Sequence, residues 1–410
     1  MILAPAELER YADAIVKASL SLRRGETLIV QGAPAHRELM VAIAEAGYRV
    51  GARTVDAMTV DPLVRRARLR HGRDDALGVV TPWAAKRYRE MMKNDVALAS
   101  IAGESDPEYL DGVDPKRIGT DFKRMAADRA VAAYRRAHLD MRTRWTIAAW
   151  PTDPWAAKVY PELELLEAKQ RLARDLLWFC RLTDEDGAGA SGWIAHERSL
   201  TKRSAKLTRL ALARLELRGP GTELDVRLVP GTRWIGGYEK TSYGVRVMPN
   251  MPTEETFTSP HADATEGTFT CTFPLSFQGR VIEGLRGEFR NGRLVRLDAK
   301  TDADRDLVAA YIDSDAKNGR RLGEVALVDA TSRIGQRGRT YFDTLLDENA
   351  AAHIAFGSGF ANTRADKPAR NLNRSPVHLD VMIGSPDFEA TGIDGRGRRI
   401  PVIEQGLWQI

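Results

Sequence analysis

The chain has 410 residues, of which 43% are hydrophobic and 29% are charged, so it is long enough to bury more than one hydrophobic core. Its 61 Lys and Arg residues nearly balance its 56 Asp and Glu residues, and the formal net charge is only +5. A surplus this small argues against a dedicated nucleic-acid-binding protein. The densest basic stretch, residues 65–73, is followed at once by Asp74 and Asp75, and we interpret it as a solvated helix face.

Only two cysteines are present, Cys180 and Cys271, which excludes a disulfide framework and any multi-cysteine zinc or iron–sulfur site. The first ten residues lack a basic segment followed by an apolar core, and no window approaches the ~18 uninterrupted apolar residues of a membrane span. We therefore expect a cytoplasmic protein with neither nucleic-acid nor membrane partners.

The first 150 residues alternate between helical and strand periodicity. Helices are predicted over 8–20, 36–46 and 84–92, and strands over 27–31, 52–56, 96–101 and 146–150. This alternation is typical of a largely parallel sheet with helices on its faces.

The pattern changes after long helical stretches that reach about residue 206. Frequent glycines there separate runs such as 224–228 and 294–297, in which apolar and polar residues alternate. Such runs predict antiparallel strands. We therefore predict an α/β fold in two domains, with an N-terminal α/β domain over 1–205 and a β-rich α+β C-terminal domain over 206–410.

The sequence contains no phosphate-binding loop. A Gly-x-Gly-x-x-Gly after a strand is absent from the first domain, and the pair Gly357 and Gly359 lacks the third glycine. A cofactor, if there is one, is therefore expected to be something other than a dinucleotide.

His378 and Asp380 stand two residues apart in an apolar run that predicts a strand. Alternate residues of a strand point to the same face, so the imidazole and the carboxylate project together. Such a pair provides two ligands of a metal site. Taken alone, however, the pair fits a His–Asp hydrogen bond on an exposed strand face better than a metal site.

A second cluster contains Glu348 and His353. We expect Asp347 to be an N-cap and residues 350–356 to form a helix. Five positions correspond to about 140° around a helix, so the two side chains do not automatically share a face, although they could serve adjacent metal ions. The alternative is a first-turn acid with a half-buried histidine.

Three more glutamates complete the inventory. Glu324 begins a buried strand, where an unpaired carboxylate is costly, and Glu254 and Glu255 follow a proline-containing loop that could simply start a helix. Four separate segments thus supply two histidines, an aspartate and several glutamates. These are the ligand types of a carboxylate-rich two-metal hydrolytic site.

Four segments carry a resemblance to a known family. They are residues 249–261, 321–328, 342–353 and 378–385. Together they resemble the M29 metallopeptidases, the family of aminopeptidase T and aminopeptidase S, and the likeness runs nearly end to end. The resemblance implies an N-terminal α/β domain, a β-rich domain with two divalent ions, a homodimer, and removal of N-terminal amino acids from peptide or aminoacyl substrates.

Carried over by position, the resemblance also implies the site residues. The expected metal ligands are Glu255, Glu324, Glu348, His353, His378 and Asp380. Glu324 is the expected bridge, Glu324 and Glu348 are the catalytic candidates, and Glu254 is the alternative to Glu255. The two ions are expected to be Zn²⁺, Co²⁺ or Mn²⁺, which activate a bridging water while a nearby carboxylate accepts its proton.

One position departs from the family pattern. Phe360 stands where the resemblance implies a tyrosine that hydrogen-bonds the tetrahedral oxyanion. Loss of one such donor typically lowers turnover by a factor of about 10²–10³. Tyr341 or Arg364 could supply the donor instead.

Three alternatives to the aminopeptidase stay open at this point. An amidase could keep the site and change its substrate. A ring-cleaving Fe(II) dioxygenase of the dihydroxypyridine type could use His353, His378 and Asp380 as its iron ligands, but would leave Glu255, Glu324 and Glu348 without a role. A catalytically silent binding protein should have lost ligands, and none is missing.

Overall fold

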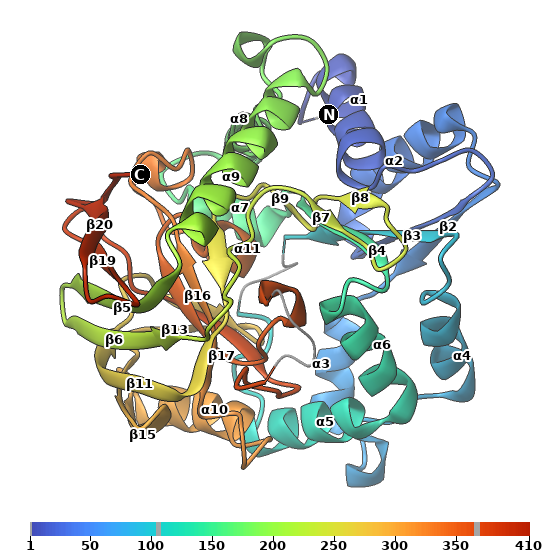
Figure 1. Ribbon diagram of the computed structural model, residues 1–410. Helices are drawn as coiled ribbons and strands as arrows, with labels where there is room; N and C mark the ends of the chain where they lie inside the picture. Colours follow the sequence, from blue (N-terminus) through green and yellow to red (C-terminus); the bar gives the residue numbers. More distant parts are fainter. Residues whose placement is uncertain (1, 104–107, 365–369) are drawn as a thin grey trace.

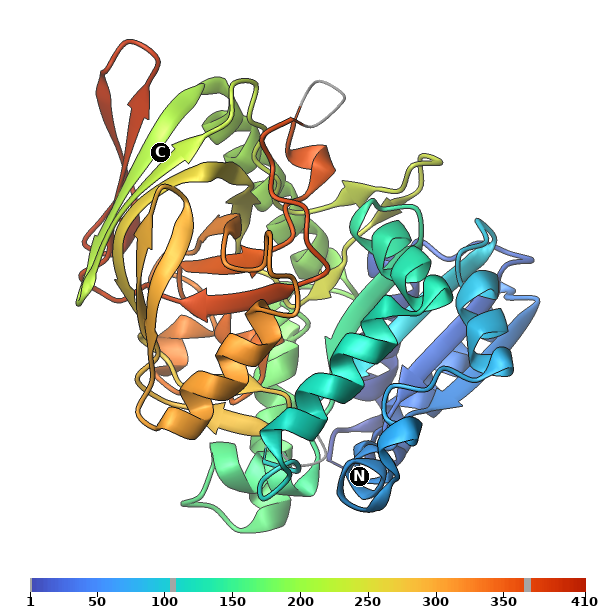
Figure 2. The same cartoon turned by 90° about the horizontal axis from the view of Figure 1, so that it is seen from below.

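The computed structural model describes residues 2–103, 108–364 and 370–410. A parallel sheet with its helices, built by the first part of the chain, lies beside antiparallel sheets built by the last part (Figures 1 and 2). This architecture confirms the predicted fold class, in which an α/β region precedes a β-rich region. Within the described ranges, no helix has the length and hydropathy needed to cross a membrane.

The first sheet has five parallel strands in the order β2-β1-β3-β4-β9. These strands are β1 (Thr27–Gly32), β2 (Thr54–Thr59), β3 (Val96–Ala102), β4 (Arg144–Ala149) and β9 (Asn250–Met251). The helices around them are α1 (Pro5–Asp13), a π-helix (Ala14–Ser19), α2 (Arg37–Val50), α3 (Pro62–His71), α4 (Pro82–Glu90), α5 (Pro115–Ala127) and α6 (Arg129–Leu139). The first four strands alternate with helices along the chain, as the periodicity predicts.

Strand β9 comes from much later in the sequence than its neighbours. Its Asn250 pairs with Ile147 of β4. The extended segment after β9 leads to Glu255, so strand pairing holds this carboxylate close to the N-terminal sheet.

Three helices connect the two regions, namely α7 (Asp153–Val159), α8 (Leu165–Phe179) and α9 (Ser191–Arg209). Leu172 and Leu176 recur at helical spacing on α8 and are buried. They belong to one apolar cluster with Leu345 and Leu346 of α11 (Thr344–Asp347). This packing fixes the short helix that directly precedes Glu348.

Antiparallel strands dominate the C-terminal region, in an eight-stranded sheet of order β15-β14-β11-β6-β5-β19-β20-β21 and a four-stranded sheet of order β10-β16-β17-β18. The larger sheet contains β5 (Leu212–Gly219), β6 (Thr222–Leu228), β11 (Pro260–Thr270), β14 (Arg286–Arg290), β15 (Arg293–Asp298), β19 (Glu389–Asp394), β20 (Arg399–Glu404) and β21 (Leu407–Trp408). The smaller sheet contains β10 (Thr256–Thr258), β16 (Leu322–Leu327), β17 (His353–Gly357) and β18 (His378–Met382). Two-stranded ribbons pair β7 (Glu239–Lys240) with β8 (Arg246–Val247) and β12 (Leu275–Phe277) with β13 (Arg280–Ile282), and α10 spans Asp302–Ile312.

The four-stranded sheet has one apolar and one polar face. Val325, Ile354 and Leu379 point into the hydrophobic core that the sheet shares with the eight-stranded sheet. Because side chains alternate along a strand, the residues next to them project from the opposite face. That opposite face carries four of the six predicted metal ligands, namely Glu324, His353, His378 and Asp380.

Residues 350–356 form no helix, contrary to the prediction. Helix α11 already ends at Asp347, and β17 begins at His353 between β16 and β18. The alanine-rich sequence favours a helix locally, but pairing on both sides satisfies the backbone of β17 and outweighs that propensity. Asp347 is therefore the last residue of a helix, and Asp343 occupies the N-cap position.

The arginine-rich helix α3 is solvated only in part. Arg68 and Arg65 form ion pairs with Asp121 of α5, at 2.9 and 3.4 Å, and the Asp121 side chain is fully buried. Arg70 and Arg73 are exposed, as predicted for this stretch. The prediction of a solvated face is thus wrong for the two arginines that neutralise a buried carboxylate.

Candidate active site

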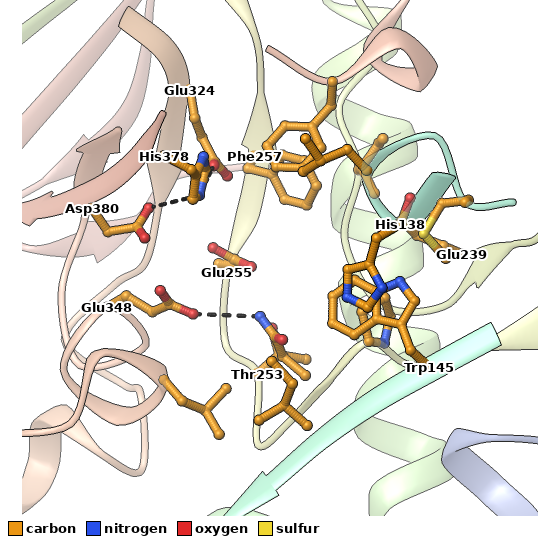
Figure 3. Close-up of a pocket in the computed structure, with 18 of the residues that line it drawn as sticks. His138, Trp145, Glu239, Thr253, Glu255, Phe257, Glu324, Glu348, His378 and Asp380 are labelled. Atoms are coloured by element: carbon orange, nitrogen blue, oxygen red, sulfur yellow. Dashed lines mark hydrogen bonds and ion pairs between the residues drawn. The ribbon is translucent and has the colours of Figure 1, made fainter. Parts of the chain in front are cut away.

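One pocket collects the predicted site residues (Figure 3). Its volume is about 420 Å³, within the roughly 300–1,000 Å³ of small-molecule sites. The four-stranded sheet forms one wall, and α6 and β4 form another. The predicted ligands that line the pocket are Glu255, Glu324, Glu348, His353, His378 and Asp380.

The register of the four-stranded sheet explains how residues distant in sequence meet. Ala355 of β17 pairs with Glu324 of β16 on one side and with Asp380 of β18 on the other. The small methyl group of Ala355 leaves space between the two carboxylates. His353 and His378 each lie two residues from this row, so their imidazoles project from the same face.

Two clusters of possible ligand atoms result. Glu255, Glu324 and His353 form one, Glu324, His378 and Asp380 form the other, and within each cluster the atoms lie within 4.8 Å of one another. Glu324 belongs to both, and its Oε2 lies 3.6 Å from Nε2 of His378. A carboxylate has two oxygens, so Glu324 is placed where a bridging ligand would have to be.

Each histidine also contacts a carboxylate of its own cluster. Nε2 of His353 lies 3.2 Å from Oε2 of Glu255, and Nε2 of His378 lies 3.3 Å from Oδ1 of Asp380. Nδ1 of His353 donates a hydrogen bond to the carbonyl of Ala351 at 3.3 Å. This bond orients the ring so that Nε2 faces the pocket.

Glu254 is oriented away from both clusters. Its carboxylate is paired with Arg181 at 2.6 Å, lies 3.4 Å from Nε2 of His196, and accepts a hydrogen bond from the backbone N–H of Arg333. No helix starts here, and in this extended segment Glu255 points into the pocket instead. Of the two adjacent glutamates, the geometry therefore favours Glu255.

Glu348 lines the pocket but lies outside both three-residue clusters. The side-chain amides of Asn250 and Asn349 each approach its Oε1 at 3.4 Å. The turn after α11, rather than helical spacing, brings it into the same space as Glu255 and Asp380 (Figure 3).

The buried charges in this pocket strongly influence one another. Burial, reinforced by repulsion from the surrounding carboxylates, raises the pKa of Glu324 and of Glu348 well above the usual value. At Asp380 burial also opposes ionisation, but His378 and His353 outweigh it and lower the pKa. Burial disfavours the charged form of His353, yet Glu255 raises its pKa above the usual value.

This donor set fits divalent cations. Mutually repelling carboxylates are stabilised when a cation is bound between them, and mixed imidazole and carboxylate donors suit Zn²⁺, Co²⁺ or Mn²⁺. Nδ1 of His378 is buried and has no hydrogen-bond partner among the described residues. The residues present are therefore compatible with a metal centre.

Glu239 is a pocket residue that the sequence did not reveal. It belongs to the two-residue strand β7, and the side-chain amide of Asn362 donates a hydrogen bond to its carboxylate. Burial raises the pKa of Glu239 to about 7; the hydrogen bond from Asn362 opposes this rise and the charge of Glu255 adds to it. A single glutamate in a glycine-rich loop gives no recognisable pattern.

The residues considered as replacements for the family tyrosine differ in position. Phe360 lines the pocket, whereas Tyr341 and Arg364 do not. The Tyr341 hydroxyl is buried 3.4 Å from Asp175, and the Arg364 guanidinium donates to the carbonyl of Arg370 at 2.5 Å. Neither side chain is placed to donate a hydrogen bond inside the pocket.

Comparison with known proteins identifies the family of this chain. The model of a family described as thermophilic metalloprotease (M29) matches residues 5–408. The chain belongs to the M29 family. The resemblance inferred from four sequence segments is thus confirmed, and so is the prediction that this M29 chain is an enzyme, a hydrolase of the metallopeptidase class.

Relatives match the M29 chain along nearly its full length. It is 34% identical to aminopeptidase T of Thermus aquaticus and 32% identical to aminopeptidase AmpS of Bacillus subtilis, each over 98% of both chains. The solved structure of wild-type AmpT from Thermus thermophilus matches with a TM-score of 0.88 and 32% identity, covering 99% of each chain.

Proposed function

We propose that this M29 enzyme is an aminopeptidase that uses two divalent ions to remove the N-terminal residue from peptides and related aminoacyl compounds. The observation that carries the proposal is the position of Glu324, which both ligand clusters share. The relatives, whose names are those of aminopeptidases, support the choice of substrate.

The two clusters define which residues would hold the ions. Glu255 and His353 would hold one ion, His378 and Asp380 the other, and Glu324 both. Bound Zn²⁺, Co²⁺ or Mn²⁺ supplies a water of lowered pKa and polarises the scissile carbonyl.

Glu348 has a separate part in this scheme. Its carboxylate lines the pocket outside both clusters, and burial raises its pKa, which makes its ionised form a stronger base. One oxygen of the Glu348 carboxylate would accept a proton from the attacking water. Glu348 would then pass this proton to the nitrogen of the leaving group. Asn250 and Asn349, which donate to Oε1, hold that carboxylate in place.

The iron dioxygenase is the less satisfactory alternative. It would employ His353, His378 and Asp380, but leave Glu324 and Glu255 as buried carboxylates without a partner cation. A buried carboxylate without a partner cation is costly to ionise and is driven to take up a proton instead. The relatives reported above give it no support.

Metal analysis paired with an aminoacyl substrate panel tests the proposal. We expect about two divalent ions per chain, hydrolysis of aminoacyl p-nitroanilides and short peptides, and chelator inhibition that added Co²⁺, Zn²⁺ or Mn²⁺ reverses. Oxygen-dependent consumption of a dihydroxypyridine without peptide turnover would select the dioxygenase instead. Hydrolysis confined to non-peptide amides would indicate the altered amidase.

We also propose that the enzyme is a homodimer. The side chains of edge strand β2 are mostly exposed. On the helices that follow β2, the exposed fraction is 69% for Val64 of α3 and 72% for Trp83 of α4. A second copy would bury these apolar groups. Light scattering coupled to size exclusion should give twice the mass of one chain, and Val64→Glu should shift the measured mass toward that of the monomer.

We propose a cytoplasmic location for the enzyme. Its two cysteines, Cys180 and Cys271, are free thiols, as is usual in a reducing compartment.

A further inference from the structure

The pocket extends well beyond the metal ligands, toward a wall built by the N-terminal region. The lining residues of this wall are Tyr134, His138, Leu139, Met141 and Trp145, from α6, the turn after it, and β4. Figure 3 shows His138 and Trp145 across the pocket from Glu324, His378 and Asp380. We call these five residues the aromatic wall.

We propose that the aromatic wall is the subsite for the side chain of the substrate's N-terminal residue, and that it selects large neutral aromatic side chains. This inference rests on the proposed aminopeptidase function. It assigns that function a substrate preference that the metal ligands do not specify.

The first argument is the surface that the wall offers. The rings of His138 and Trp145 are stacked, with centroids 3.9 Å apart and planes at 20°, and Tyr134 packs against His138 at 5.5 Å. A set of rings held in this way presents a rigid aromatic surface. Aromatic side chains pack against such surfaces in offset-stacked or edge-to-face geometry, which adds to the gain from burying their area.

The second argument is an unused polar atom in the wall. Nε1 of Trp145 is buried and has no hydrogen-bond partner within the described part of the chain. A buried donor without a partner is costly, and an acceptor carried by a ligand would remove that cost if the indole, which lines the pocket, turned its N–H toward the ligand. A tyrosine hydroxyl or the face of an aromatic ring can accept such a hydrogen bond, whereas an aliphatic side chain cannot.

The third argument is charge. Burial lowers the pKa of His138 to about 3, so its ring is neutral at physiological pH. The two other charged groups near the wall have opposite signs and existing partners, because Arg135 lies over the ring of Phe122 and Asn362 donates to Glu239. The wall itself therefore carries no charge with which to recognise a basic or acidic side chain.

Substrate geometry connects the wall to the N-terminal residue. An aminopeptidase must hold both the free amine and the scissile carbonyl beside the catalytic cluster, and the Cα atom lies between these two groups. The side chain on that Cα therefore starts beside the cluster and extends into the remaining volume of the pocket. That remaining volume ends at the aromatic wall.

The first test compares aminoacyl p-nitroanilides, which share one leaving group and differ only in the amino acid. For the metal-loaded enzyme, kcat/KM of phenylalanyl p-nitroanilide should exceed that of the alanyl, lysyl and glutamyl compounds by about tenfold or more. The dipeptide Phe-Ala should likewise be cleaved faster than Ala-Phe. Equal or higher kcat/KM for alanyl or lysyl substrates, or faster cleavage of Ala-Phe, would overturn the assignment.

The second test uses point variants to show whether Trp145 is responsible for the preference for the phenylalanyl substrate. Trp145→Ala should lower kcat/KM for the phenylalanyl substrate about tenfold while changing the alanyl value less than about threefold. Leu166→Ala, at an exposed leucine of α8 outside this pocket, is the control and should leave both values unchanged. A uniform loss for both substrates in Trp145→Ala would contradict a subsite role. His138→Ala, judged in the same way, replaces Trp145→Ala if that variant does not fold.

Binding separates this inference from the proposed function. Calorimetry on the wild-type enzyme should show L-phenylalanine binding about tenfold more tightly than L-alanine, with the difference reduced in Trp145→Ala. If no aminoacyl compound is hydrolysed but this difference is found, the aminopeptidase proposal fails and the aromatic subsite stands. If peptides are hydrolysed but the two amino acids bind equally, the subsite fails alone.

Discussion

Phe360 packs edge-on against the imidazole of His378, with ring centroids 5.6 Å apart and planes at 81°. The same ring contacts Phe257 at 5.2 Å. These contacts fix the ring next to a candidate metal ligand without offering a hydrogen-bond donor there. A hydroxyl on this ring would add a donor in the pocket at little structural cost.

We therefore expect Phe360→Tyr to raise kcat for aminoacyl p-nitroanilides by roughly tenfold or more, because one oxyanion donor is typically associated with a factor of 10²–10³. Steady-state kinetics at saturating metal measures the effect. Phe257→Tyr adds a hydroxyl to the neighbouring pocket ring and serves as the control. An unchanged or lower kcat in Phe360→Tyr would mean that the enzyme uses another donor.

Substitution of Glu324 should affect both metal positions. We expect Glu324→Gln to reduce the metal content from about two ions per chain to well below one, because both clusters depend on this side chain. Plasma mass spectrometry after dialysis measures the content. Retention of two ions would show that Glu324 is not a shared ligand.

The neighbouring pair Glu254 and Arg181 provides a matched comparison. Glu254→Gln should keep its metal but lose stability, because Arg181 would be left buried without its ion pair. Breaking a buried pair on one side costs about 3–5 kcal/mol. Metal analysis and thermal unfolding of the same sample separate the two effects.

Glu239 should make the metal-free protein less stable as the pH rises. Its folded-state pKa of about 7 lies above the usual value of 4.5, so its carboxylate favours folding most below pH 4.5, and this stabilisation is lost as the pH rises through 7. Glu239→Gln removes that titration. The stability of the variant relative to wild type should therefore rise by about 2 kcal/mol between pH 5 and pH 8. The difference between the two melting temperatures, measured at each pH, should become more positive in the same range. A difference that does not change with pH would contradict the assignment.

Gly357 ends strand β17 with φ of +95°, and a Cβ atom there would lie 2.2 Å from the carbonyl oxygen of Val377. Gly357→Ala should therefore destabilise the protein by about 3 kcal/mol and weaken metal binding, because Gly357 pairs with His378. Thermal unfolding and metal titration measure the two effects. Gly395→Ala, where a Cβ atom meets nothing within 4 Å, should have little effect on either.

Much of the architecture could be predicted from local sequence. Strands β1 and β3 lie almost where their apolar runs predicted them, because a strand buried on both faces needs an uninterrupted apolar segment. Strand β18 also agrees, with Leu379 in the core and His378 and Asp380 on the opposite face. In these segments local pattern and tertiary environment favour the same structure.

Segments whose local preference conflicts with their environment could not be predicted. Residues 350–356 favour a helix in isolation, yet β17 forms there because its neighbours supply hydrogen bonds on both sides. Likewise, two residues of β9 join the N-terminal sheet, a pairing between positions about a hundred residues apart that no local pattern encodes.

The amino-acid sequence by itself determined the class of protein, since its motifs identified the M29 family and the residue types capable of binding metal. Only the tertiary structure decided which of the adjacent residues Glu254 and Glu255 enters the pocket, that Glu324 lies between two histidines, and that an aromatic wall closes the far side. The physical reason is that ligand geometry depends on strand register and on contacts between distant segments. Those relationships exist only once the chain has folded.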